Sequence, residues 1–247
     1  TSPRGVTVHA DTLGAMVKEI KNNGRLKLSQ LGGYAWNTVE GEGCTVFSGQ
    51  GTPVRGTLLL TKASSHVCGR EVGTAARSAD SMEVRLDLKT SSAEDTRLAG
   101  IEIGDFVAFD PRVEVNQGFI RSRHLDDKAG MACLLAAIKA LDDAGLSPAQ
   151  ETILHFSNYE EVGHGAAAGL PENLTELLVV DMAAVGNGQA SDEYHATLCV
   201  KDSRGPYHHG LSQRMRKLAD QYRIPYKVDI YPYYGSDGGA FWRAGGD

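Results

Sequence analysis

The length, composition and charge of the chain exclude several classes of protein. Its 247 residues, 41% hydrophobic and 23% charged, are enough to bury a core without disulfides, and they fit neither a disordered chain nor a coiled coil. The net charge is -6 and no block of Lys or Arg occurs, so nucleic acid and anionic membranes are not expected as partners.

The cysteines and the lack of membrane signals indicate a reducing compartment. The four cysteines form no CxxC pair, which argues against a zinc ribbon and a disulfide framework: Cys44, Cys68, Cys133 and Cys199. We expect mostly buried thiols. No apolar stretch approaches the roughly 20 residues of a membrane-spanning helix, and the chain does not open with the charged and apolar regions of a signal peptide. The expected location is cytoplasmic.

The first predicted element is a short buried strand. Residues 5–10 (GVTVHA) are a β-branched run that ends beside His9 and Asp11. Residues 18–111 then consist of short alternating segments separated by glycine-rich turn signals. In the clearest segment, 81–89, charged residues alternate with Met82, Val84, Leu86 and Leu88. This pattern predicts a half-buried antiparallel sheet or a small barrel.

Beyond residue 111, helical periods alternate with strand-like runs. Apolar residues at helical spacing predict an amphipathic helix that ends near Gly145: Met131, Leu134, Leu135, Ile138 and Leu141. A second helix is marked by Leu211, Met215, Leu218 and Tyr222. Strands are expected at 151–158, 177–180 and 226–231, and the middle one leads directly to Asp181. Alternating strands and helices indicate a largely parallel sheet.

Together these patterns predict an α/β fold with two domains. Residues 1–17 and 112–247 would form a discontinuous domain, in which a mixed, mostly parallel sheet is flanked by helices. Residues 18–111 would form an inserted β-rich, barrel-like domain.

Four clusters of acidic residues or histidine lie at the ends of predicted strands, where open α/β sheets bind ligands. They are His9-Ala10-Asp11, Asp126-Asp127-Lys128, Glu160-Glu161 and Asp181. Each cluster alone has an ordinary explanation, such as a buried histidine, a helix N-cap or solvated surface charge. Asp181 is harder to explain in this way, because it follows the apolar run Leu-Leu-Val-Val.

Taken together, the clusters predict a divalent metal site. Several carboxylates that converge on one crevice repel each other unless a cation lies between them. One histidine with several carboxylates and no thiolate suits zinc, cobalt or manganese better than calcium. A further carboxylate beside the metal is what a hydrolase needs to accept a proton from water.

The order of the motifs resembles the M42 metallo-aminopeptidases, which include glutamyl and tetrahedral aminopeptidases. The similar segments extend over nearly the whole chain: VHADTLG at 8–14, HLDDKAG at 124–130, SNYEEVGHGAA at 157–167, LVVDMA at 178–183 and YGSDGGAFW at 234–242. EEVG within such an ordered set is a specific signal, whereas any one motif alone is not. The resemblance implies a zinc-peptidase-like fold and the metal-dependent hydrolysis of N-terminal residues from peptides.

The resemblance also implies a role for individual residues. His9, Asp126 and Asp181 would hold one metal ion, and Asp126 would bridge to a second ion held by Glu161. Glu160 would be the general base that takes a proton from the metal-activated water and later protonates the departing amine.

Supporting residues and partners follow from the same resemblance. Asp11 would accept a hydrogen bond from the His9 ring and fix its tautomer, and Asp237 with Gly235 would lie by the substrate. The cofactors would be two divalent ions per subunit, zinc or alternatively cobalt or manganese. The partners would be peptides with a free N-terminus and further copies of the chain, from a dimer to a dodecamer, joined through residues 18–111.

The chain departs from the family pattern at three points. Family members usually carry a further metal-binding histidine after the YGSDGGAFW segment and several dozen residues before the first motif, and neither lies within the 247 residues, so the second metal site as written is incomplete. His208 and His209 do not replace it well, because adjacent residues of an extended segment point to opposite faces. Lys128 stands where the family more often has Arg.

Other functions stay open. The missing histidine motivates a catalytically silent scaffold subunit, and a metal-dependent deacylase of small modified peptides would use the same residues. A glycosidase is disfavoured, because Glu160 and Glu161 are adjacent, whereas the paired carboxylates of glycosidases flank the scissile bond about 5 to 9.5 Å apart.

Overall fold

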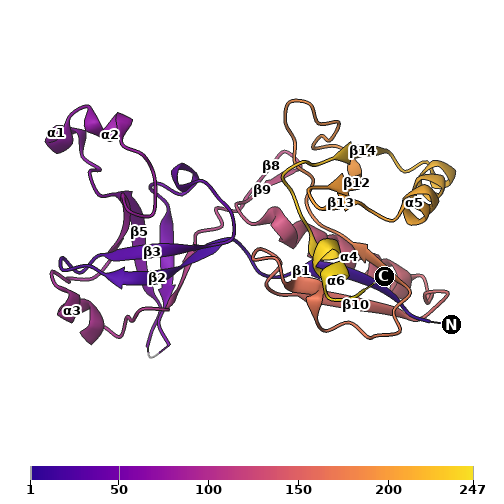
Figure 1. Cartoon of the computed structure of the whole chain (residues 1–247), viewed down its shortest axis with the longest axis horizontal. Coiled ribbons are helices and arrows are strands. Elements are labelled where there is room, and N and C mark those ends of the chain that lie inside the picture. The colour runs from indigo at the N-terminus through magenta and orange to yellow at the C-terminus, as the bar shows by residue number, and fades with distance from the viewer. Residues whose placement is uncertain (1, 50, 247) are drawn as a thin grey trace. The chain divides into compact units, whose positions relative to one another are not determined.

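The computed structural model describes residues 2–49 and 51–246, which belong to two compact units (Figure 1). One unit comprises Thr1–Asp11 and Leu125–Asp247, and the other comprises Thr12–His124. The second unit extends beyond the expected range 18–111 at both ends. Its first barrel strand, β2 (Gly14–Ile20), begins before residue 18, and it also contains a hairpin of β8 (Glu114–Asn116) and β9 (Phe119–Arg121).

The second unit is built around a closed barrel, as one of the two sequence alternatives predicted. Its strands follow the order β2-β3-β6-β5-β4-β7, and every neighbouring pair is antiparallel. The remaining strands are β3 (Leu26–Leu31), β4 (Gly43–Phe47), β5 (Val54–Leu60), β6 (Met82–Leu86) and β7 (Phe106–Phe109). Closure leaves neither side of this sheet with an unpaired edge.

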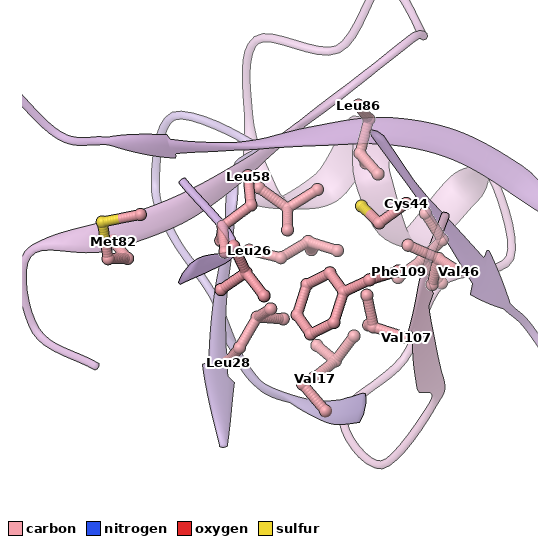
Figure 2. Packing of buried hydrophobic residues seen from close by; sticks show 14 of the residues in the cluster. Val17, Leu26, Leu28, Cys44, Val46, Leu58, Met82, Leu86, Val107 and Phe109 are labelled. Carbon is pink, nitrogen blue, oxygen red and sulfur yellow. The ribbon is translucent and has the colours of Figure 1, made fainter. Parts of the chain in front are cut away.

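Alternate residues of the barrel strands fill its interior. Leu26, Leu58 and Val84 are fully buried. The ring of Phe109 lies close to Leu26 and Val107 in the barrel interior (Figure 2). Burying every second side chain of each strand produces the period of two that the sequence displays. The apolar core of this unit therefore follows directly from its alternating pattern.

The segment 81–89 departs from the simple alternation at two positions. β6 ends at Leu86, and Leu88, expected to be buried, is 40% exposed because it lies beyond the strand. Glu83, expected to face solvent, is 3% exposed and is paired with Lys21 at 2.6 Å and Arg25 at 2.5 Å. The two cations compensate for burial of the carboxylate.

Short helical segments connect the barrel strands. They are η1 (Trp36–Thr38), α1 (Ser65–Cys68), α2 (Glu71–Thr74) and α3 (Ala93–Leu98). The start of α3 is fixed by a capping box, in which Ser92 and Asp95 satisfy each other's backbone N–H groups.

The described residues of the first unit form two three-stranded sheets. In one, β1 (Arg4–His9) lies between β10 (Thr152–Ser157) and β11 (Glu176–Val179), and both pairings are parallel. In the other, β12 (Ala196–Asp202) pairs in parallel with β14 (Tyr226–Ile230) and antiparallel with β13 (Gly205–Pro206). The α/β class is confirmed, and the expected parallel pairing is present, but it is divided between two sheets.

Three α-helices lie among the described residues of this unit. They are α4 (Leu125–Asp143), which contacts β1, α5 (His209–Tyr222), and α6 (Asp237–Arg243), which contacts β11 and the short helix η2 (Gly165–Ala167). α6 occupies part of the expected YGSDGGAFW loop, and its N-terminus is capped by Ser236. None of the helices among the described residues is long and apolar enough to cross a membrane.

The apolar face predicted for α4 is only partly covered. Leu134 is buried, whereas Leu135 is 54% exposed and Leu141 is 37% exposed. Leu218 and Tyr222 of α5 are exposed as well. The spacing of apolar residues located both helices correctly, but none of the described residues covers these four side chains.

All four cysteines are free, in agreement with the sequence prediction that they form no disulfide framework. The expected burial holds for Cys44, which lies in the barrel core. Cys133 on α4 is exposed, because it lies away from the buried Leu134 side of the helix, and Cys68 and Cys199 are partly buried.

Candidate active site

The carboxyl ends of three parallel strands bring the predicted clusters together. His9 ends β1 and is in register with Ser157 at the end of β10, three residues before Glu160. Asp181 follows the end of β11 on the other side of β1. Because parallel strands end at the same edge of a sheet, side chains distant in sequence meet here.

The imidazole of His9 lies at the centre of the cluster and is 2% exposed. Its Nε2 is 2.9 Å from Oδ1 of Asp126, 3.7 Å from Oδ1 of Asp181 and 3.9 Å from Oε2 of Glu160. Its Nδ1 is 3.0 Å from the backbone oxygen of Asp11. One ring nitrogen thus faces carboxylates, while a main-chain oxygen holds the other.

Two groups of side chains in the described chain could each hold a metal ion. One consists of His9, Asp127 and Asp181, and the other of His9, Asp126 and Glu161. Within each group the potential ligand atoms lie within 4.8 Å of one another. Glu160 lies beside His9 but belongs to neither group, so it remains available for another role.

Asp11 holds the loop that carries the two glutamates. Its Oδ1 accepts the backbone N–H of Glu160 and its Oδ2 accepts that of Glu161, both at 3.2 Å. The carboxylate is 3.6 Å from Nδ1 of His9, farther than the backbone oxygen of the same residue. Burial alone would raise the pKa of Asp11, but His9 and the two N–H groups lower it. The side chain of Asp11 therefore orders Glu160 and Glu161, and its main chain holds the His9 ring.

Asp127, to which the sequence assigned no metal role, is buried in the first turn of α4, beside the end of β1. Its Oδ2 accepts the backbone N–H of His9 at 3.2 Å and its Oδ1 accepts that of Gly130 at 3.1 Å. A Cβ atom on Gly130 would lie 2.2 Å from this Oδ1, so the carboxylate fits only beside a glycine. Lys128 donates a hydrogen bond to the backbone oxygen of Ala10, which ties α4 to the segment after β1.

Asp237 is also buried against a glycine. Its Oδ2 accepts from the hydroxyl of Ser157 at 2.5 Å and its Oδ1 accepts the N–H of Ala166 at 2.8 Å. A Cβ atom on Gly165 would lie 2.0 Å from Oδ1. These contacts join the start of α6 to β10 and η2. The expected substrate contact of Asp237 and Gly235 stays a prediction, whereas an anchoring role for Asp237 is directly visible.

Burial, together with neighbouring negative charge, raises the pKa of three carboxyl groups. Burial, followed by the charge of Asp181, raises the pKa of Asp127 to about 7 and that of Glu160 to about 8. Burial and the charge of Asp126 raise the pKa of Glu161 to about 7. Burial alone would lower the pKa of His9, but hydrogen bonds to neighbouring carboxylates raise it. Each shift reports a site that favours added positive charge.

The donor atoms fit a small divalent cation. The cluster offers one imidazole and several carboxylates without a thiolate, a set that suits zinc, cobalt and manganese. Oε1 of Glu161 is buried and has no hydrogen-bond partner, although most buried polar atoms are paired. A cation beside Glu161 would satisfy this oxygen and reduce the repulsion among the carboxylates.

Tyr234 contacts the site although no motif assigned it a role. Its hydroxyl donates to Oδ2 of Asp181 at 2.6 Å, while the backbone N–H of Met182 donates to Oδ1 at 2.7 Å. Burial, followed by the charge of Asp181, raises the pKa of Tyr234. Asp181 and Tyr234 also line a cavity of about 760 Å³ with residues of β11, β12 and α5. Tyrosines near the end of the chain were visible in the sequence, but nothing there distinguished this one.

His208 and His209 lie outside the cluster, as the sequence analysis expected. Nδ1 of His208 accepts the backbone N–H of Leu211 at 3.0 Å and caps α5. His209 is exposed at the first position of the helix. Neither residue belongs to the groups of side chains that could hold a metal within the described chain.

Solved structures support the fold. A TET aminopeptidase from the marine sediment archaeon Thaumarchaeota archaeon SCGC AB-539-E09 superposes with a TM-score of 0.84 at 21% identity, over 97% of this chain and 69% of that chain. The TET1 peptidase of Pyrococcus horikoshii, which can assemble into a tetrahedron or a large octahedral shell, superposes with a TM-score of 0.82 at 22% identity, over 98% and 72%.

Sequence comparisons identify the family. The family model for M42 glutamyl aminopeptidases matches residues 2–247. The Bacillus subtilis (strain 168) protein named "Putative aminopeptidase YhfE" is 47% identical over 245 residues, which are 99% of this chain and 70% of that protein. The chain therefore belongs to the M42 glutamyl aminopeptidase family, and this membership supports an aminopeptidase function.

Proposed function

We propose that the chain acts as a dinuclear metal-dependent aminopeptidase on peptides with a free N-terminus. The observation that carries the proposal is the position of His9 between two sets of carboxylates, each of which could hold a metal ion. The metal dependence of the M42 family supports the same reading. Zinc is the favoured ion, with cobalt and manganese as alternatives.

We assign one ion to His9, Asp126 and Asp181, and a second to Asp126 and Glu161. Asp127 is close enough to take part, but both of its oxygens already accept backbone N–H groups. Oδ1 of Asp126, by contrast, lies 2.9 Å from Nε2 of His9, the ring nitrogen that faces the carboxylates. The bound ions would supply Lewis-acid chemistry, which polarises the peptide carbonyl and lowers the pKa of water.

Glu160 is assigned as the general base. It lies 3.9 Å from Nε2 of His9 without joining either ligand group, and Asp11 fixes its main chain. Its carboxylate would accept a proton from the attacking water and then donate that proton to the nitrogen of the departing amine. Because the raised pKa of about 8 arises from burial and from Asp181, nearby cations would return the group to its ionised form.

Substrate binding and assembly belong to the same proposal. Gly235 and Asp237 would lie along the wall of the substrate site, with Asp237 acting through Ser157 and Ala166. Further copies of the chain would associate through the β-rich unit, around residues 18–111. The large assemblies of the similar Pyrococcus horikoshii TET1 peptidase support a homo-oligomer.

Substitution of Glu160 tests the assignment of the base. Glu160→Gln should bind zinc as the unchanged protein does but lose about 10²- to 10⁴-fold in turnover of free-amine aminoacyl substrates. The exposed Glu172→Gln serves as the matched control and should change neither quantity. Metal-stripped protein is supplied with zinc, cobalt or manganese, and both metal content and hydrolysis rate are measured.

The substrates separate the competing functions. Hydrolysis of N-acetylated substrates alone would favour a deacylase, and silence of a metal-loaded protein toward both substrate classes would favour a scaffold subunit. Retained turnover in Glu160→Gln would remove Glu160 as the base, even if the aminopeptidase activity itself were established.

A further inference from the structure

The hydroxyl of a tyrosine that belongs to neither group of potential metal ligands contacts the candidate ligand Asp181. Oη of Tyr234 donates to Oδ2 of Asp181 at 2.6 Å. Oδ1 of the same carboxylate faces Nε2 of His9 at 3.7 Å. Tyr234 and His9 thus approach different oxygens of the Asp181 carboxylate.

Several contacts hold Tyr234 in place. Its backbone oxygen accepts both the N–H of Ser203, at 2.9 Å, and the hydroxyl of Ser203, at 2.6 Å. Its ring meets the ring of Tyr231 edge to face, with centroids 5.7 Å apart and an angle of 73° between the planes. These contacts fix the main chain and the ring of Tyr234 independently of Asp181. The hydrogen bond from its hydroxyl to Asp181 therefore has a small cost in conformational entropy.

The hydrogen bond has two consequences for Asp181. It fixes the plane of the carboxylate, so that Oδ1 stays directed toward His9. It also places a hydrogen-bond donor beside the negative charge of Asp181, and that charge contributes to the raised pKa values of Asp127 and Glu160. Partners of this kind, which contact a ligand rather than the metal, orient the ligand and tune its affinity.

We propose that Tyr234 is a positioning residue for Asp181 and sets the affinity of the metal ion that Asp181 and His9 hold. The inference rests on the metal site of the proposed function. It adds Tyr234, a residue to which the sequence analysis gave no role. Tyr234 would act on the metal site through the carboxylate of Asp181.

Tyr234→Phe tests the proposal, because it removes the hydroxyl and keeps the ring beside Tyr231. Zinc affinity, measured by competition with a chromophoric chelator, should fall about 10- to 100-fold. Tyr233→Phe is the first control, because Tyr233 is 99% exposed, and Tyr231→Phe is the second, because its buried hydroxyl bonds to Ser191 instead. Both controls should bind zinc within about twofold of the unchanged protein.

Two further measurements separate positioning from general loosening. In an Asp181→Ala background, Tyr234→Phe should produce no further loss of affinity, because the carboxylate through which it acts is absent. The visible spectrum of the cobalt-loaded protein should shift in Tyr234→Phe and not in Tyr231→Phe. If Tyr234→Phe fails to fold, Ser203→Ala, which removes one bond to Tyr234, should lower zinc affinity in the same direction.

The outcomes distinguish the two proposals. Unchanged zinc affinity in Tyr234→Phe, or an equal loss in Tyr231→Phe, would overturn the role of Tyr234 and leave the aminopeptidase proposal intact. An unchanged protein that binds no divalent metal would instead overturn the metal site itself. These readouts do not depend on catalytic turnover, so they are informative whatever the substrate.

Discussion

The two units of the chain bury different chemistry. The barrel unit encloses a cluster of apolar side chains such as Leu26, Leu58 and Val84, each with no exposed surface. Among the described residues of the other unit, buried positions are more often polar, and His9, Asp127 and Asp237 are each about 2% exposed or less. Apolar packing supplies stability in the first case. In the second, hydrogen bonds hold buried polar groups in fixed positions in and beside the candidate site.

The largest expected effect tests the barrel side of this comparison. Leu58→Ala should lower the free energy of unfolding by about 2–5 kcal/mol, because it leaves a cavity in a fully buried core. Zinc affinity should stay unchanged, since no proposed metal ligand lies in the barrel unit. Urea unfolding is followed by the fluorescence of Trp36 in a Trp242→Phe background, where Trp36 is the remaining tryptophan.

Leu98→Ala provides the matched control. Leu98 belongs to the same unit but is 81% exposed, so the same substitution should change stability by about 0.5 kcal/mol or less. A comparable loss in both variants would contradict the claim that burial in the barrel, rather than leucine content, stabilises this unit.

The next largest effect concerns the unit with the buried polar groups, where a glycine packs against the carboxylate of Asp127. Gly130→Ala places a Cβ atom 2.2 Å from Oδ1 of Asp127, so the carboxylate that supports His9 must move. We expect a loss of about 10- to 100-fold in zinc affinity, or about 1.4–2.7 kcal/mol. Helix propensity alone would give no such loss, because alanine normally stabilises a helix interior relative to glycine.

A control glycine in the same unit sharpens this test. An added Cβ on Gly186 would have no atom within 4 Å, so Gly186→Ala should leave zinc affinity unchanged. Gly165→Ala, which crowds Asp237 at 2.0 Å, should disturb the site as Gly130→Ala does. If all three variants bind zinc equally well, the close packing of glycine against carboxylate has no bearing on the metal site.

The sequence predicted what depends on periodicity and order. The period of two along residues 81–89 predicted barrel strands, and the helical spacing after Met131 located α4. Strand ends also predicted the site, because His9 and Asp181 each follow an apolar run. Neighbouring parallel strands end at one edge, so these residues meet without any further information.

What the sequence did not predict depends on contacts between distant residues. Leu88 is exposed because β6 ends before it. Glu83 is buried because Lys21 and Arg25 compensate its charge. Tyr234 resembles its neighbour Tyr233 in the sequence, yet one bonds to Asp181 and the other is 99% exposed. Such differences arise from the register of packed elements, which residue types alone do not record.

The smallest expected effect concerns the pH dependence of the metal-free protein. The pKa values of Asp127, Glu160 and Glu161 are raised from 3.8 or 4.5 to about 7, 8 and 7, so between about pH 4 and pH 8 the folded protein binds more protons than the unfolded chain. Stability must then fall as pH rises through this range. The raised pKa of His9 acts in the same direction, whereas the lowered pKa of Asp11 acts only below about pH 4.

Thermal unfolding in the presence of a chelator should therefore show a melting temperature that decreases by about 2–4 °C from pH 5 to pH 8, or about 1 kcal/mol after solvent screening. Glu160→Gln should flatten this slope, because one of the repelling charges is gone, and the exposed Glu172→Gln should not. Zinc should reverse the slope, since a bound cation favours the ionised carboxylates. A melting temperature that rises with pH without metal would contradict the raised pKa values of these buried carboxyl groups, and with them one physical reason for placing a cation among them.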